Sequence, residues 1–199
     1  MAVVLEQETS SYAEYPGRKL WTREELHRLE SIGLIDLHNC ELIDGVLIRK
    51  VGKNRGHTNS LMLLVIWLRS VFEPTQVQHE ASIDMLPEDD PTNEPEPDAV
   101  VTTRPLTVFR ETNPGPQDIA LLVEVAETTL RFDLGAKARL YARSRIPEYW
   151  VLDVSDRRLI VHRNPEQGRY TTVVAYGAEE SVAPLAAPQH SVLVSSLFL

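Results

Sequence analysis

Residues 119–126, IALLVEVA, constrain the fold of this 199-residue chain more than any other segment. Every residue in the run is apolar except Glu124. A continuous apolar run of this length, without the alternation of a half-exposed strand, is typical of a strand buried on both faces. The run therefore predicts a central strand whose single carboxylate lies inside the protein.

A carboxylate in such a strand needs compensation. An unpaired charge in an apolar interior costs several kcal/mol, so Glu124 requires a nearby cation, a hydrogen-bond network or a metal ion. It can belong to a catalytic site, or it can close a buried salt bridge that has no catalytic role.

Asp98 is a second candidate, at the start of another strand. Pro95 and Pro97 cannot belong to a central ladder, so this strand begins at Asp98 and continues through Ala99, Val100 and Val101. The carboxylate is then placed at the mouth of the strand. A simple turn is the alternative for a Pro-Asp pair.

Lys137 is the third candidate and lies on a predicted helix. Apolar residues recur at helical spacing over residues 133–145, and Asp133 is predicted as the N-cap. Asp133, Lys137 and Tyr141 share one stripe of this helix at intervals of four. Lys137 can therefore point at the strand of Glu124 or pair with Asp133.

The other periodicities predict an α/β core. Its elements follow in the order αβββαβ, at residues 57–72, 77–85, 98–103, 118–126, 133–145 and 148–153. We expect an α/β (α+β) fold in which helices flank a mixed central sheet.

Additional elements are predicted on both sides of this core. A capping box of Thr22 and Glu25 indicates an earlier helix through about Leu29. CELIDGVLIRK predicts a β-hairpin around Asp44-Gly45, and a β-meander at 159–162 and 170–176 follows the core.

Glu41 and His57 are candidates by position alone. Glu41 begins the first strand of the hairpin, where a Glu is usually exposed. His57 lies in the first turn of its helix, where a capping or solvent-facing histidine is the ordinary alternative.

Length and composition predict one domain over residues 20–199 after a loosely ordered lead-in at 1–19. Cys40 is the only cysteine, so no intramolecular disulfide can form. The longest apolar runs are too short for a bilayer span, and MAVVLEQETS lacks a charged leader. We expect a soluble, cytoplasmic protein without a membrane partner.

The charge distribution is uneven. A net charge of −9 argues against indiscriminate binding to polyanions. Basic residues nevertheless cluster at 49–55 and 131–145, whereas residues 88–98 carry acids and no base. The basic clusters are either contacts for a nucleic-acid backbone or ordinary solvated faces.

Several of these segments together resemble the Uma2-like family of endonucleases (DUF820), within the PD-(D/E)xK nuclease superfamily. The matching segments are PEPDAVV, LLVEVAETT, the D-x-x-x-K of Asp133 and Lys137, Tyr141, IPEYWVLD, ELIDGVL and the histidine that opens the next helix. The resemblance covers roughly residues 20–175 and implies a restriction-endonuclease-like core.

The resemblance also implies roles for the candidate residues. Asp98 and Glu124 would bind Mg²⁺ or Mn²⁺, and Lys137 would be the catalytic lysine, supplied by the following helix. Glu41 would be a further acidic member of the site and His57 an auxiliary. The chain departs from the superfamily pattern at Ala126, where a lysine is usual, and from the family at Glu127, where a serine is common.

The function expected from this resemblance is metal-dependent hydrolysis of DNA phosphodiester bonds. One alternative is a binding or assembly protein that keeps the nuclease fold without the reaction, as the net charge of −9 suggests. Another is a metal-dependent hydrolase of a different phosphoester. A homodimer is expected because double-strand cleavage needs two sites, with interface area from Tyr149, Trp150 and the tail at 191–199.

Overall fold

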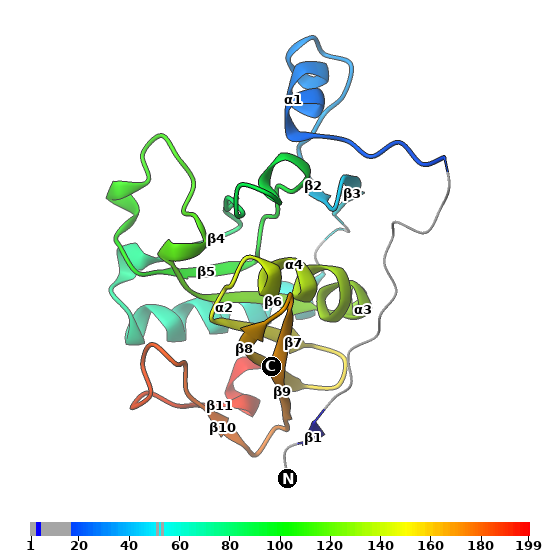
Figure 1. Cartoon of the computed structure of the whole chain (residues 1–199). Helices are drawn as coiled ribbons and strands as arrows, with labels where there is room; N and C mark the ends of the chain where they lie inside the picture. The colour runs from blue at the N-terminus through cyan, green and yellow to red at the C-terminus, as the bar shows by residue number, and fades with distance from the viewer. Residues whose placement is uncertain (1–2, 5–16, 51, 53) are drawn as a thin grey trace.

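A seven-stranded mixed sheet forms the centre of the protein (Figure 1). The structure is a computed structural model that describes residues 3–4, 17–50, 52 and 54–199. The strand order is β1-β9-β8-β7-β6-β5-β4; β6 and β7 run parallel and the other neighbours antiparallel. The strands are β1 (Val3–Val4), β4 (Val77–His79), β5 (Ala99–Thr102), β6 (Ile119–Ala126), β7 (Glu148–Asp153), β8 (Arg158–Glu166) and β9 (Arg169–Tyr176).

β6 is the buried central strand that the apolar run predicts. Its residues are buried except for the half-buried Ala120, and the neighbouring strands β5 and β7 are buried along their whole length. Ala99 pairs with Val123 across the ladder, so Asp98, directly before β5, lies beside Glu124 of β6. Sheet register therefore brings the two predicted carboxylates together.

Helices cover both faces of the sheet (Figure 1). On one face α2 (Arg55–Val71) packs Leu61, Leu64 and Leu68 against a core that includes Val123. On the other face lies a helical segment made of α3 (Leu130–Phe132), a π-helical turn (Asp133–Lys137) and α4 (Ala138–Arg143). Because side chains alternate along a strand, Glu124 faces this second layer.

The start of this helical segment differs from the prediction. The helix begins at Leu130, so the predicted N-cap at Asp133 is wrong. Asp133 has helical backbone angles, and its carboxylate accepts a hydrogen bond from Thr129 Oγ1 at 2.6 Å. The sequence pattern does not show the three residues of α3, in which Leu130 and Phe132 are partly buried and Arg131 is exposed.

The predicted N-terminal elements are present. The capping box of Thr22 and Glu25 begins α1 (Arg23–Ser31). The hairpin forms a separate sheet of β2 (Cys40–Ile43) and β3 (Val46–Arg49), and its turn residues Asp44 and Gly45 have positive φ angles of 49° and 74°. The lead-in predicted for residues 1–19 falls largely outside the described residues.

Two strand predictions need adjustment. β4 ends at His79, well before the predicted residue 85, because Glu80 turns out of the strand with a φ of 52°. The predicted C-terminal meander, β8 and β9, extends the central sheet instead of flanking it. A small sheet of β10 (Ser181–Val182) and β11 (Val192–Leu193) follows, and short 3-10 turns lie at Pro74–Gln76, Asp90–Thr92, Leu106–Val108, Pro116–Asp118 and Val194–Leu197.

The residues predicted to supply a dimer interface lie mainly in the core. Tyr149 and Trp150 are fully buried, and Val194, Leu197 and Phe198 of the tail join the core under α2. The prediction that these aromatic residues supply interface area is therefore wrong. Among the residues described, no helix is long and apolar enough to cross a membrane.

Candidate functional site

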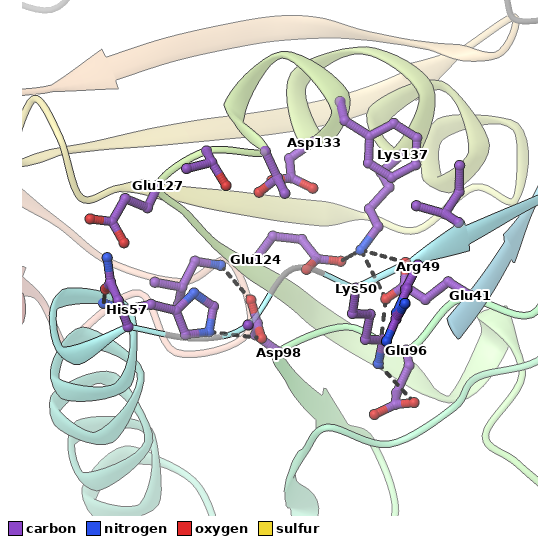
Figure 2. Close-up of a pocket in the computed structure, with 17 residues that line it drawn as sticks. Glu41, Arg49, Lys50, His57, Glu96, Asp98, Glu124, Glu127, Asp133 and Lys137 are labelled. Atoms are coloured by element: carbon purple, nitrogen blue, oxygen red, sulfur yellow. Dashed lines mark hydrogen bonds and ion pairs between the residues drawn. The ribbon is translucent and has the colours of Figure 1, made fainter. Parts of the chain in front are cut away.

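A cleft of about 330 Å³ contains all the candidate residues predicted from the sequence (Figure 2). It lies where the hairpin and the start of α2 meet the start of β5, the C-terminal end of β6 and the π-helical turn. The five candidates that line it are Glu41, His57, Asp98, Glu124 and Lys137.

The two strand carboxylates are fixed at one side of the cleft. Both residues are less than a tenth exposed. Asp98 Oδ2 accepts a hydrogen bond of 2.8 Å from the backbone N–H of Val125, which ties the start of β5 to β6. The position at a strand mouth that was predicted for Asp98 is confirmed.

Lys137 lies against Glu124 and not against Asp133. Its Nζ donates to Glu124 Oε1 at 2.8 Å and lies 2.9 Å from Glu41 Oε2. Tyr141, one turn further along the stripe, donates to the same Glu124 oxygen at 3.0 Å. Glu124 is therefore held by a cation and a hydroxyl from a single helix.

The π-helical turn is the local feature that carries Lys137. Ala138 donates its backbone N–H to the carbonyl of Asp133, five residues back, so this turn is wider than an α-helical turn. Such turns are rare and often occur at functional sites. Propensity and periodicity do not distinguish a π turn from an α turn, so sequence analysis missed it.

Burial and neighbouring charges shift the pKa values of both members of this pair. Burial raises the pKa of Glu124 well above its usual value, although the charge of Lys137 opposes the shift. Burial alone would lower the pKa of Lys137, but Glu124, Glu41 and Asp133 together raise it well above its ordinary value. Lys137 therefore remains protonated and supplies the cation that the buried Glu124 requires.

Glu41 and His57 both line the cleft. Glu41 is buried in β2 and contacts Lys137, so the alternative of an exposed strand-initial Glu does not hold. The side chain of His57 is 12% exposed, and its Nε2 lies 3.3 Å from Asp98 Oδ1 without the geometry of a hydrogen bond. Its backbone N–H is capped by Asn54 Oδ1.

The predicted basic surface at residues 131–145 is smaller than its sequence suggests. Lys137 is buried, and Arg143 forms ion pairs with Asp44 of the hairpin turn and with Asp89. These two bases have structural partners inside the protein and are not part of an open basic face.

The cleft also contains residues that sequence analysis did not single out. Lys50 Nζ lies 2.8 Å from Glu96 Oε2 and 3.7 Å from Glu41 Oε1. Lys50 belongs to the basic cluster at 49–55, and Glu96 belongs to the acidic segment at 88–98, within PEPDAVV. Only the tertiary fold brings the two side chains together. Glu127, the family departure, lines the cleft and is partly buried.

The oxygen donors suit a hard divalent cation. The described lining carries six carboxylates, from Glu41, Glu96, Asp98, Glu124, Glu127 and Asp133, against the three bases Arg49, Lys50 and Lys137. Mg²⁺ commonly uses one or two protein carboxylates and keeps several waters. Asp98 and Glu124 fit that requirement, whereas the described residues hold no group of three or more His, Cys, Asp or Glu side chains arranged for a metal ion.

Comparison with known proteins agrees with this architecture. The sequence model of the Uma2 family, described as "Putative restriction endonuclease", matches residues 23–194. A solved structure with a similar fold is a "putative nuclease belonging to DUF820" from Anabaena variabilis ATCC 29413, with a TM-score of 0.65. Its sequence is 17% identical, and the alignment covers 89% of this chain and 97% of that one. No curated protein matches the chain.

At that identity, the structural likeness concerns the fold alone. The family match, in contrast, spans most of the chain and includes every residue of the cleft. The protein therefore has a restriction-endonuclease-like α/β fold and belongs to the Uma2 family.

Proposed function

We propose that this protein is a Mg²⁺- or Mn²⁺-dependent endonuclease that hydrolyses phosphodiester bonds of DNA. The observation that carries the proposal is the meeting of Asp98, Glu124 and Lys137 in one cleft of a chain that matches a nuclease family. Two carboxylates and a cation are the groups that metal-assisted phosphodiester hydrolysis needs.

In this proposal Asp98 and Glu124 hold the metal ion. A divalent cation, if held by these two residues, would supply a bound water of lowered pKa and positive charge to stabilise the phosphoryl oxygens. The burial that raises the pKa of Glu124 favours partnership with a cation, because a second positive charge offsets the lost hydration.

The remaining candidates act around these two carboxylates. Lys137 is the proposed catalytic lysine, which orients the attacking water or neutralises developing charge. Glu41 contacts the same Lys137 ammonium as Glu124, and His57 lies beside Asp98 as an auxiliary. The lysine thus comes from the helix that follows β6, because Ala126 occupies the usual position.

The proposed substrate and assembly follow from the family. The basic cluster at 49–55, together with Arg131, Arg139 and Arg145, would contact the DNA backbone. A homodimer would supply two sites for double-strand cleavage, and light scattering tests that state. We propose a cytoplasmic location, because a single cysteine suits a reducing compartment.

Cleavage assays test the proposal. Supercoiled, linear duplex and single-stranded DNA are incubated with wild-type protein and Mg²⁺, Mn²⁺ or a chelator. We expect metal-dependent cleavage that disappears in Asp98→Ala and persists in Asp156→Ala, whose side chain is 64% exposed away from the cleft. No cleavage of any DNA form by wild-type protein would overturn it.

A non-catalytic binding role is the second candidate function. It is favoured by the contacts of Lys137 with both Glu124 and Glu41, in which the Lys137 side chain is only 6% exposed. In that case wild-type protein and Asp98→Ala would bind DNA equally without cutting it. Hydrolysis of a small phosphoester by the wild type, with DNA left intact, would support the third alternative.

A further inference from the structure

We infer that Lys50 is a phosphate-binding residue of the cleft. In the free protein the Lys50 ammonium group is paired with the Glu96 carboxylate, and a substrate phosphate replaces that carboxylate on binding. This inference rests on the proposed phosphodiester substrate. Lys50 Nζ lies 2.8 Å from Glu96 Oε2, and both side chains line the cleft. Figure 2 shows the two residues at the same end of the cleft as Glu41.

The fold holds this pair in place through the backbone. Lys50 directly follows β3, and its N–H donates to the carbonyl of Asn39 at 2.7 Å. The segment that carries Glu96 is joined to the other hairpin strand, because Glu94 N–H donates to the Leu42 carbonyl at 2.7 Å. The hairpin therefore positions both the lysine and its carboxylate partner.

Exposure distinguishes Lys50 from Lys137. The side chain of Lys137 is 6% exposed and that of its partner Glu124 5%, whereas Lys50 is 22% and Glu96 30% exposed. Breaking a buried ion pair leaves an uncompensated charge in the core, whereas solvent can partly screen the charges of a pair that is partly exposed. A phosphate group can therefore take over Lys50 at far smaller cost than Lys137.

The chemistry of the exchange is simple. A phosphodiester oxygen and the Glu96 carboxylate are both anionic acceptors for an ammonium group, so one can replace the other. Glu96 then acts as an internal competitor: it neutralises Lys50 in the free protein and adds to the repulsion of DNA. Removing the charge of Glu96 should tighten substrate binding, and removing that of Lys50 should weaken it.

Binding of a fluorescent oligonucleotide, followed by anisotropy, tests the inference without relying on cleavage. The titrations are made in chelator and again with Ca²⁺, over a range of salt concentrations. We expect Lys50→Ala to weaken binding about fivefold and to lower the salt slope by about one. Glu96→Gln should tighten binding to a similar extent, and Lys50→Arg should retain it.

Lys19→Ala is the matched control, because Lys19 forms an exposed ion pair with Glu25 and lies outside the cleft. Circular dichroism checks that each variant is folded. Equal binding by Lys50→Ala, Lys19→Ala and wild-type protein would overturn the role of Lys50 while leaving the proposed nuclease in place. Weaker binding by Glu96→Gln would overturn the exchange. No binding by wild-type protein would overturn the DNA substrate and this inference together.

Discussion

The ammonium group of Lys137 lies 2.8 Å from the carboxylate of Glu124, although the two residues come from a helical turn and a central strand thirteen positions apart. Both side chains are almost entirely removed from solvent. Glu41 also contacts Lys137, and Tyr141 also contacts Glu124. The pair is therefore both a structural element of the core and the centre of the candidate active site.

Replacing Lys137 by Met tests whether the ion pair between Lys137 and Glu124 stabilises the fold. The change keeps the length of the side chain but leaves Glu124 without its cation, next to the carboxylates of Glu41, Asp98 and Asp133. We expect the free energy of unfolding to fall by about 3–5 kcal/mol, as for other broken buried pairs. Urea unfolding followed by circular dichroism measures it.

The control for this variant is Lys19→Met, which removes an exposed lysine and should change stability by less than about 0.5 kcal/mol. The double variant Lys137→Met/Glu124→Gln should be more stable than Lys137→Met alone, because the uncompensated charge is gone. Wild-type stability in Lys137→Met would contradict a stabilising ion pair.

Glu124→Gln tests metal binding directly. This near-isosteric change removes one proposed ligand charge while keeping a side chain that can contact Tyr141. We expect calorimetry to show Mn²⁺ or Mg²⁺ binding to the wild type and at least tenfold weaker binding to the variant, the order seen when a metal site loses a key group. Glu166→Gln, an exposed change in β8, serves as the matched control.

Two results of that titration would count against a metal ligand at Glu124. Equal binding by wild type and Glu124→Gln would place the ion elsewhere. Binding by neither protein would leave Glu124 as the partner of Lys137 in a salt bridge and would favour the binding-protein alternative.

The pH dependence of stability tests Asp133. Burial raises its pKa from 3.8 to about 6, although Lys137 opposes the shift. Because the folded pKa exceeds the unfolded one, the stability associated with this group is greatest below about pH 4 and is lost as the pH rises through 6. Ionised Asp133 therefore costs roughly 3 kcal/mol at neutral pH.

Asp133→Asn should remove this cost, because the amide oxygen can still accept the hydrogen bond from Thr129. In metal-free buffer with a chelator, we expect urea unfolding to show the variant roughly 1–3 kcal/mol more stable at pH 8, with a smaller difference at pH 5. A variant less stable than wild type at pH 8 would contradict the raised pKa.

The sequence predicts the central part of this site well, for physical reasons that are local. The apolar run places Glu124 in the core, and helical spacing places Lys137 and Tyr141 on one stripe. Both inferences need only the period of a strand or helix. The confirmed capping box and the hairpin turn are local in the same sense.

What the sequence could not predict depends on tertiary packing. The pairing of Lys50 with Glu96 requires the hairpin and the segment before β5 to meet. Aromatic residues of a strand, such as Tyr149 and Trp150, can lie either in the core or at an interface. Only the fold shows that these two are buried in the core. The π turn at Asp133–Lys137 has no periodic signature in the sequence.

His162 gives a pH dependence of the opposite sign. Burial lowers its pKa from 6.5 to about 4, and within the described residues its Nδ1 has no hydrogen-bond partner. Because the folded pKa lies below the unfolded one, the stability from neutral His162 is fully present above pH 6.5. It is lost as the pH falls through 4, and the total change is roughly 3 kcal/mol.

The effects of Asp133 and His162 on stability therefore have opposite signs between pH 4 and 6.5 and partly cancel in the wild type. Single variants separate the two effects. His162→Phe, which can keep the ring contacts with Tyr149 and Tyr170, should lose less stability on acidification than wild type. Asp133→Asn should lose more. His190→Gln, an exposed change, is the control and should follow the wild-type curve. Urea midpoints measured at intervals from pH 8 to pH 4 test this order, and parallel curves for His162→Phe and wild type would contradict a depressed pKa at His162.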